Sequence, residues 1–172
     1  INGFLFDYFV HLSFTQDKYV KSLFDLSTDS YTHQPVSLNY YKNYWLKHPA
    51  QNNIYPLPVG YKINIIKGFI ERKENNLICN YKDWLYSQFG SYFTDNFSIP
   101  YTRKYWTIDP ELMSIEWIAN RIYRPSLDEV LYGAMMDETP NTYYASEMRY
   151  PISGRYISFI TEMINSIDIH LN

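Results

Sequence analysis

Apolar residues recur every three or four positions in several stretches of the chain, a pattern that is typical of amphipathic helices. The clearest case covers 80–89, where Asn80 is placed to cap the first turn and Gly90 to end the helix. A second helix is expected from a cap at Thr15 to Leu26. Three further helices are expected over 63–70, 126–133 and 156–164.

Proline interrupts this helical pattern in the second half of the chain. The apolar stripe that continues through Phe97 stops at Pro100, so we predict a loop or a kinked segment over 101–106. Shortly afterwards, Asp109 followed by Pro110 is typical of another helix start, because proline is favoured at the first helical position.

Strand patterns are fewer and shorter. Residues 3–10 are apolar and aromatic apart from Asp7, which indicates a buried strand. Residues 36–40 alternate between apolar and polar side chains and predict the first strand of a hairpin that ends near Pro49. The alternating segment 167–172 indicates the beginning of another strand. The fold class that follows is α+β, mixed and dominated by helix.

Length and composition narrow the class of protein. A chain of 172 residues with 46% hydrophobic residues can bury a core and suggests one domain. A net charge of −3 provides no basic stripe, so we do not expect nucleic-acid binding. No apolar run approaches the roughly 18–20 residues that span a bilayer, so we expect no membrane partner. Cys79 is the only cysteine, which excludes an internal disulfide and favours the cytoplasm.

Aromatic residues are unusually frequent, with 19 Tyr, 10 Phe and 4 Trp. Tyr101 and Trp106 lie close to Arg103, and Arg121 and Arg124 follow. Flat rings beside guanidinium groups can stack on a base and bind a phosphate. The alternative is that Tyr101 and Trp106 are partly buried packing residues and the arginines pair with surface carboxylates. The sequence contains no Gly-rich phosphate loop, no nucleophile elbow and no zinc-ligand spacing, so we predict no metal site.

The same segment resembles the signature of UDP-galactopyranose mutases. Tyr101-Thr102-x-Lys104-x-Trp106-x-x-Asp109-Pro110, with Arg121-Ile122 beyond it, is similar to their Y-T-x-K-Q-W-G-x-D-P and R-I pattern. Looser likenesses follow in the family's order: Phe6-Asp7-x-x-x-His11, Tyr55-Pro56-Leu57-Pro58-Val59, Gln88-Phe89-Gly90 and Tyr150-Pro151-Ile152-Ser153-Gly154-Arg155-Tyr156.

The chain also departs from the family pattern in several places. Tyr105 and Thr107 stand where the family has Gln and Gly. Phe9-Val10 replaces Gly-Gly, and Phe14 replaces a second His. Glycine allows the close approach of backbone to a ligand, so these departures predict a weaker contact with flavin. They also predict either a different substrate or loss of the mutase reaction.

The resemblance implies a flavoprotein related to protoporphyrinogen oxidase and amine oxidases, with FAD as cofactor and a nucleotide sugar such as UDP-galactose as substrate. In the mutases, reduced FAD attacks the anomeric carbon and UDP leaves. By position, Tyr101 would stack on uracil, Trp106 would lie near the sugar and Arg121 would meet the diphosphate. Tyr143 or Tyr144 would add a contact to the substrate, and the resemblance places His11 near the flavin.

The G-x-G-x-x-G turn that binds the FAD pyrophosphate does not occur in these 172 residues. We therefore expect residues 1–172 to be one substrate-side domain from the middle of a two-domain flavoenzyme, inactive alone, with 1–14 and 167–172 as strands of the FAD domain. Two alternatives stay open: part of a flavin-dependent amine or porphyrinogen oxidoreductase, and a noncatalytic carbohydrate or nucleotide-sugar binding module. A homodimer is also left open.

Overall fold

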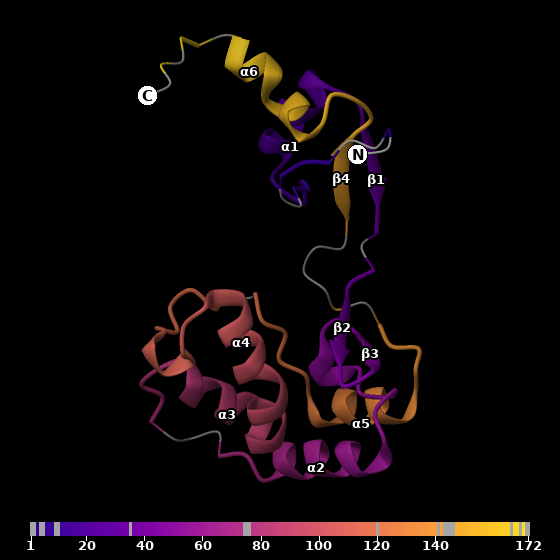
Figure 1. Cartoon of the computed structure of the whole chain (residues 1–172), viewed down its shortest axis with the longest axis vertical. Helices are drawn as coiled ribbons and strands as arrows, with labels where there is room; N and C mark the ends of the chain where they lie inside the picture. Colours follow the sequence, from indigo (N-terminus) through magenta and orange to yellow (C-terminus); the bar gives the residue numbers. More distant parts are fainter. Residues whose placement is uncertain are drawn as a thin grey trace. The chain divides into compact units, whose positions relative to one another are not determined.

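The computed structural model describes most of the chain, as residues 3, 6–8, 11–34, 36–73, 77–119, 121–140, 142, 147–165, 167–168 and 170. Contacts divide the chain into two compact units. Unit 1 contains Ile1–Pro35 and Ala145–Asn172, and unit 2 contains Val36–Tyr144 (Figure 1). Unit 2 is therefore inserted in the sequence between the two parts of unit 1.

Unit 1 is built on a pair of antiparallel strands from opposite ends of the sequence. Strand β1 (Ser30–His33) pairs with β4 (Met148–Pro151). Helix α1 (Lys18–Ser27) precedes β1, and a 3-10 turn, η4 (Tyr156–Ile160), leads into the short helix α6 (Thr161–Asn165). The helices predicted near 15–26 and 156–164 are therefore present, the second one beginning as a 3-10 turn.

Helix α1 is capped by a different residue from the one expected. The Asp17 carboxylate accepts hydrogen bonds from the backbone N–H groups of Tyr19 at 2.9 Å and Val20 at 3.0 Å. The Thr15 hydroxyl instead accepts from the Asp17 N–H. A carboxylate is as good a cap as a hydroxyl and also interacts favourably with the helix dipole, so the helix begins two residues later.

Half of the apolar run 3–10, in which the sequence indicated a buried strand, lies outside the described residues. No described residue from 3 to 10 lies in a strand, and Phe6 and Tyr8 are exposed. Within 11–14, Ser13 forms a single β-bridge with Arg149. Because a strand needs a partner for its backbone hydrogen bonds, the assignment of 1–14 and 167–172 to strands of an FAD domain stays a prediction.

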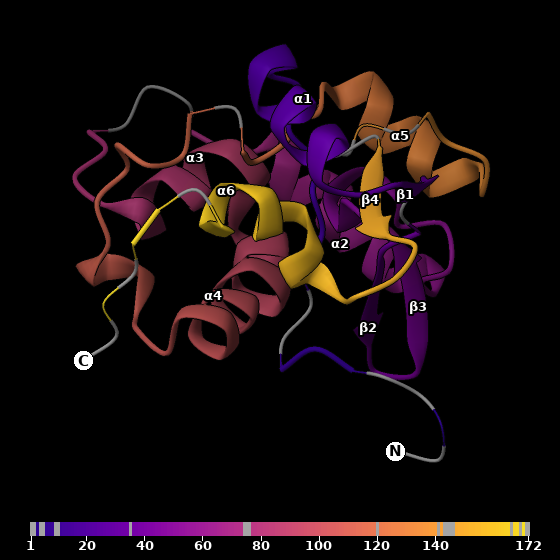
Figure 2. The same cartoon turned by 90° about the horizontal axis from the view of Figure 1, so that it is seen from above.

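Unit 2 begins with the predicted hairpin. Strands β2 (Leu38–Tyr41) and β3 (Tyr44–Lys47) pair antiparallel and lie side by side in both Figures 1 and 2. Lys42 and Asn43 turn the chain with φ of 44° and 71°, the left-handed pair that two-residue hairpins favour. A 3-10 turn, η1 (Ala50–Asn52), follows the hairpin.

Helices α2 (Val59–Ile70) and α3 (Tyr81–Phe93) pack against each other at two glycines. Gly90 has φ of 74°, and a Cβ atom on it would lie 2.0 Å from the Gly68 carbonyl oxygen. The predicted cap is confirmed, since the Asn80 side chain accepts from the Asp83 N–H. Gly90 interrupts the helix as expected, but helical turns resume after it because the chain bends and continues through a π-helical turn, η2 (Thr94–Ser98).

The prediction of a loop or a kinked segment over 101–106 is wrong. Residues Ile99–Trp106 form helix α4, with Pro100 in its first turn. Proline is tolerated there because the N–H groups of a first turn need no partner within the helix. The helix start expected at Asp109 is only a short 3-10 turn, η3 (Pro110–Leu112).

Helix α5 (Leu127–Met135) begins with a capping box between Ser126 and Glu129 and continues two residues beyond the predicted end at Gly133. A Cβ atom on Gly133 would lie 1.8 Å from the Asn52 carbonyl oxygen, so this glycine permits the contact of α5 with η1. Its role is close packing and not helix termination.

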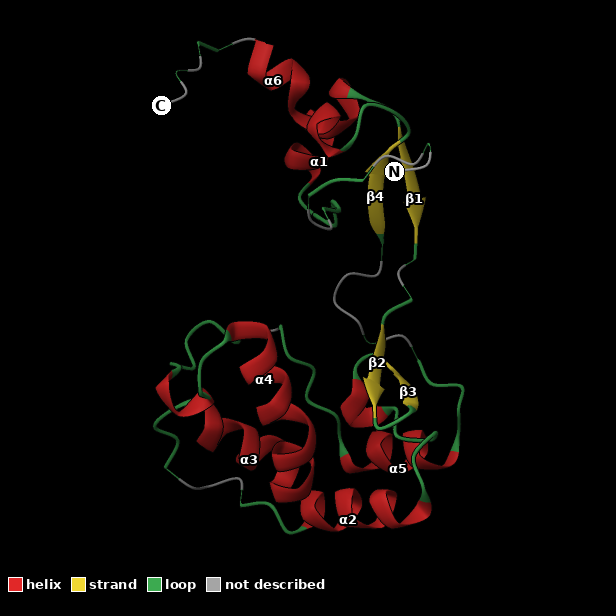
Figure 3. Cartoon of the chain, in the orientation of Figure 1, coloured by secondary structure: helices red, strands yellow, loops and turns green. Residues whose placement is uncertain are grey.

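The core of unit 2 is largely aromatic and aliphatic. Its buried residues come from the hairpin, η1 and helices α2, α3 and α5, and include Leu46, Ile54, Ile65, Phe69, Trp84, Leu85, Phe89 and Val130. Helices dominate both units and the sheets are small (Figure 3), which confirms the α+β class. In the described part of the chain, no helix has the length and apolar character to cross a membrane.

Candidate functional site

Helix α4 presents two of the residues that the sequence singled out. Tyr101 is 55% exposed and Trp106 is 45% exposed. The opposite side of the helix is buried through Ile99 and Thr102, so α4 lies at the edge of unit 2 with one face toward solvent. Both rings are therefore partly exposed, which is compatible with ligand binding and with partly buried packing alike.

A series of ring contacts connects α4 to the segment that follows η3. The rings of Tyr101 and Tyr105 are nearly parallel, at 10°, with centroids 5.7 Å apart. Tyr105 meets Trp106 edge-on at 5.0 Å. Trp106 in turn contacts Trp117 at 5.7 Å. Aromatic pairs at such separations are favourable, so the exposed rings have defined neighbours rather than independent positions.

Tyr81 is a buried residue that contacts the same group of rings. It is the first residue of α3, is 6% exposed and donates its backbone N–H to the Met113 carbonyl at 2.9 Å. Its ring meets Trp117 edge-on at 5.1 Å. Burial raises the pKa of Tyr81 to about 12, an effect that its side-chain hydrogen bond with Thr102 opposes. Tyr81 therefore joins α3, α4 and the segment around Trp117.

The arginines differ in whether they have a partner. Arg103 donates from Nε to Asp109 Oδ1 at 2.5 Å, as the surface-pairing interpretation expected. Arg121 and Arg124 are exposed, and within the described residues neither forms an ion pair. Arg121 follows Trp117 by one turn, and its N–H donates to the Ile118 carbonyl at 2.8 Å. Its side chain is exposed, and no ion pair of its guanidinium group is found among the described residues.

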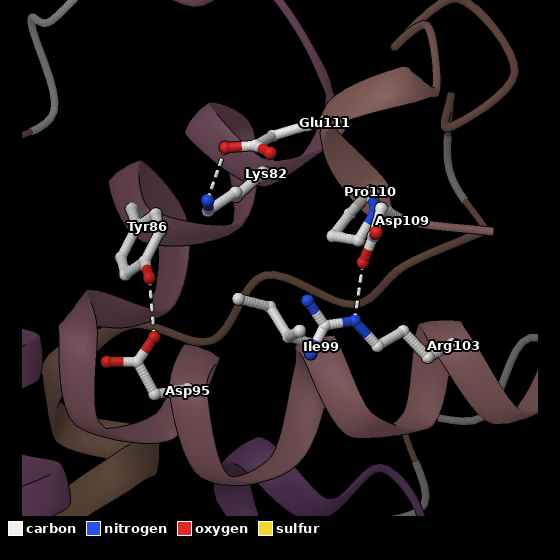
Figure 4. Close-up of a pocket in the computed structure, with 8 residues that line it drawn as sticks. All are labelled: Lys82, Tyr86, Asp95, Ile99, Arg103, Asp109, Pro110 and Glu111. Atoms are coloured by element: carbon white, nitrogen blue, oxygen red, sulfur yellow. Dashed lines mark hydrogen bonds and ion pairs between the residues drawn. The ribbon is translucent and has the colours of Figure 1, made fainter.

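A polar pocket of about 250 Å³ lies on the other side of α4 (Figure 4). Three interactions join residues that line it: an ion pair between Lys82 and Glu111, the Arg103–Asp109 ion pair, and a hydrogen bond of 2.5 Å from the Tyr86 hydroxyl to Asp95. Burial and the neighbouring Asp95 raise the pKa of Tyr86 to about 12. The lining residues are Lys82, Tyr86, Asp95, Ile99, Arg103, Asp109, Pro110 and Glu111.

The residues expected to bind substrate do not line this pocket. Tyr101, Trp106 and Arg121 lie outside it, and they are equally absent from an apolar groove along α2. Tyr143 and Tyr144 lie outside the described residues. The structure thus brings Tyr101 and Trp106 together on one helix and connects them through Trp117 to the segment that carries Arg121.

His11 belongs to unit 1, where its ring contacts Tyr156 at 5.2 Å. Flavin binding requires more than an imidazole, in particular a glycine-rich turn for the pyrophosphate. The six glycines of the chain are not spaced for such a turn. The residues of this chain do not by themselves fit FAD. A search of the described residues finds no group of three or more His, Cys, Asp or Glu side chains that could hold a metal ion.

Sequence reasoning assigned no role to Tyr81, Lys104 or Tyr105, which the structure brings next to Tyr101, Trp106 or Trp117. The signal for the last two was the i+3 and i+4 spacing from Tyr101, which has structural meaning only on a helix. Predicting a loop over 101–106 concealed that signal. Tyr81 carried no local signal, because its burial depends on residues that are distant in sequence.

Comparison with known proteins supports the resemblance at the level of fold. No family model matches the sequence. The chain is similar to a crystal structure of reduced UDP-galactopyranose mutase, with a TM-score of 0.84 and 22% sequence identity over 92% of this chain. The match covers 35% of the chain of that enzyme, so this chain spans about a third of its length. The fold is therefore that of part of a UDP-galactopyranose mutase.

Proposed function

We propose that this chain is the nucleotide-sugar-binding part of an FAD-dependent enzyme of the UDP-galactopyranose mutase kind. The observation that carries the proposal is that the two rings of the family signature, Tyr101 and Trp106, are both exposed on α4 within a fold similar to part of the mutase. Tyr101 would stack on the base, Trp106 would contact the sugar and Arg121 would bind the diphosphate.

Magnitudes are consistent with weak but measurable binding. Stacking of one base contributes about 1–3 kcal/mol, and a hydrogen bond to a charged group about 1.5–3 kcal/mol. Two such anchors together contribute about 2.5–6 kcal/mol, which corresponds to dissociation constants from about 40 μM to about 15 mM. In a whole enzyme of this kind, a flavin domain is expected to add further contacts.

Titration of the 172-residue chain with UDP tests the proposal. Tyr101→Ala and Arg121→Ala are each expected to raise the Kd by about 5- to 150-fold, equivalent to about 1–3 kcal/mol. The chain offers matched controls. Tyr132 is a 49% exposed ring on α5, and Arg124 is an exposed arginine three residues from Arg121. Tyr132→Ala and Arg124→Ala are expected to leave the Kd within about twofold.

Failure of the folded chain to bind UDP would overturn the proposal, as would equal losses in the control variants. Circular dichroism on each variant separates loss of binding from loss of fold. Binding of free galactose with no UDP binding would instead favour a carbohydrate module.

The isomerase chemistry is proposed for the whole enzyme and needs its own test. With the complete protein and reduced FAD, we expect UDP-galactopyranose to convert to the furanose form, measured by chromatography of the sugar nucleotides. Oxygen consumption with an amine or porphyrinogen substrate, without this conversion, would identify the oxidoreductase alternative.

A further inference from the structure

The exposed side of α4 carries two residues, Lys104 and Tyr105, that have no part in the proposed function above. Tyr105 lies four residues after Tyr101, and Lys104 lies three residues after it. Residues at these spacings are neighbours on one side of a helix. We call Tyr101, Lys104 and Tyr105 the α4 outer face.

The two rings of the α4 outer face are exposed and oriented alike. Tyr105 is 62% exposed and Tyr101 is 55% exposed, and their planes differ by 10°. A third planar group can therefore lie parallel to both rings and extend the stack. Aromatic side chains bind nucleobases in this way, because every base has a flat face.

Lys104 supplies a charge beside these rings. It is exposed and, across the described ranges, forms no ion pair, unlike the neighbouring Arg103, which is held by Asp109. Arg103 faces the polar pocket on the opposite side of the helix (Figure 4). The cation that accompanies the stacked rings is therefore Lys104, and an ammonium group is a suitable point charge for a phosphate.

We infer that Tyr105 and Lys104 bind the nucleoside diphosphate together with Tyr101, Tyr105 by extending the stack under the base and Lys104 by contacting a phosphate. This inference rests on the proposed function for the class of ligand. The inference goes beyond the proposed function because it assigns the binding of the nucleotide to stacking and charge. Neither interaction depends on the identity of the base.

Substitutions at position 105 test the stack. Tyr105→Gln removes the ring and is expected to raise the Kd for UDP by about 3- to 10-fold, less than the loss of Tyr101, since Tyr105 supports the base through its neighbour. Tyr105→Phe keeps the ring and is expected to stay within about twofold of the wild type. An equal loss in Tyr105→Phe would show a hydroxyl contact and overturn the stack.

Lysine variants test the contact of Lys104 with a phosphate, and a second nucleotide tests whether stacking determines recognition of the base. Lys104→Gln is expected to weaken UDP binding several-fold and to reduce its dependence on salt, while Lys18→Gln, at an exposed lysine on α1, changes neither. ADP is expected to bind at least as tightly as UDP, because a purine stacks over a larger area. ADP binding more than about tenfold weaker would overturn recognition by stacking.

The two proposals fail in different ways. If Tyr101→Ala and Arg121→Ala weaken UDP binding while Tyr105→Gln and Lys104→Gln do not, the further inference is wrong and the proposed function stands. If the folded wild-type chain binds neither UDP nor ADP, the proposed function is wrong and the inference falls with it. Tryptophan fluorescence during unfolding verifies the fold of each variant.

Discussion

Helices α3 and α4 follow each other in the chain and are similarly rich in aromatic residues, yet they use them in opposite ways. Tyr81, Trp84, Phe89 and Phe93 on α3 are between 3% and 7% exposed. The rings of α4 are 45–62% exposed. The aromatic excess therefore has two origins, a core on α3 and a surface on α4.

Their positions explain the difference. Helix α3 packs against α2 on one side and meets Met113 and Trp117 at its beginning. Helix α4 buries one narrow side and leaves the other to solvent. Burial of rings on α3 stabilises the fold directly, whereas rings on α4 contribute little stability until a ligand covers them.

The largest expected contrast is in stability. Phe89→Ala is expected to lower the free energy of unfolding by about 3–5 kcal/mol, because it leaves a cavity in a well-packed core. Tyr105→Ala is expected to change it by less than about 1 kcal/mol. All four tryptophans, Trp45, Trp84, Trp106 and Trp117, belong to unit 2, so tryptophan fluorescence in urea reports on this unit alone. Equal losses of unfolding free energy in the two variants would contradict the difference between α3 and α4.

Alkaline pH sharpens the comparison at Tyr81. Burial raises the pKa of this phenol from its ordinary value near 10 to about 12. Between these values the unfolded chain loses the proton while the folded chain keeps it, so stability is fully present below pH 10 and is lost as pH rises toward 12. We expect a loss on the order of 1 kcal/mol per pH unit. Tyr81→Phe should remove this part of the pH dependence, and Tyr105→Phe serves as the control.

The two helices also begin differently, and this predicts a smaller effect. The Asn80 side chain caps α3, while no side chain caps α4, whose first turn continues from η2. Asn80→Ala is expected to cost about 1 kcal/mol, and Ser98→Ala less than about 0.5 kcal/mol. The midpoint of urea unfolding measures both. A larger loss at Ser98 would indicate that α4 is stabilised at its beginning.

The smallest expected effect is a gain at the end of α4. Thr107 has φ of 57°, which a β-branched residue adopts only with strain. Thr107→Gly, the residue of the family signature, is expected to raise stability by up to about 1 kcal/mol, because relief of strain exceeds the added flexibility of the unfolded chain. A loss of stability would show that the Thr107 side chain makes a compensating contact.

Local signals in the sequence predicted the elements that depend on local chemistry. The cap at Asn80, the hairpin before Pro49 and the helix after Ser126 all have partners within a few residues. Position 100 misled, because proline is compatible with either the end of a helix or its first turn. The pairing of β1 with β4 was missed, since strands of four residues carry little signal and their partners are far apart in sequence.

The site was predictable in part for the same reason. The signature located Tyr101 and Trp106, and the structure describes both as exposed on α4. Whether a ring is buried or exposed depends on tertiary packing, which spacing alone does not encode. Tyr81 and Tyr105 each lie beside a lysine in the sequence. Tyr81 is buried against Trp117, whereas Tyr105 is exposed to solvent.

The pairing of β1 with β4 has a consequence for biosynthesis. Tyr31 can pair with Tyr150 only after Tyr150 has left the ribosome, more than one hundred residues later. At roughly 5–20 residues per second, β1 spends several seconds without its partner. Unit 2 is complete in sequence before β4 emerges, so it can fold first and shorten the effective loop that the strands must close. Co-translational order is thus built into the topology, with the inserted unit maturing before the one that encloses it in sequence.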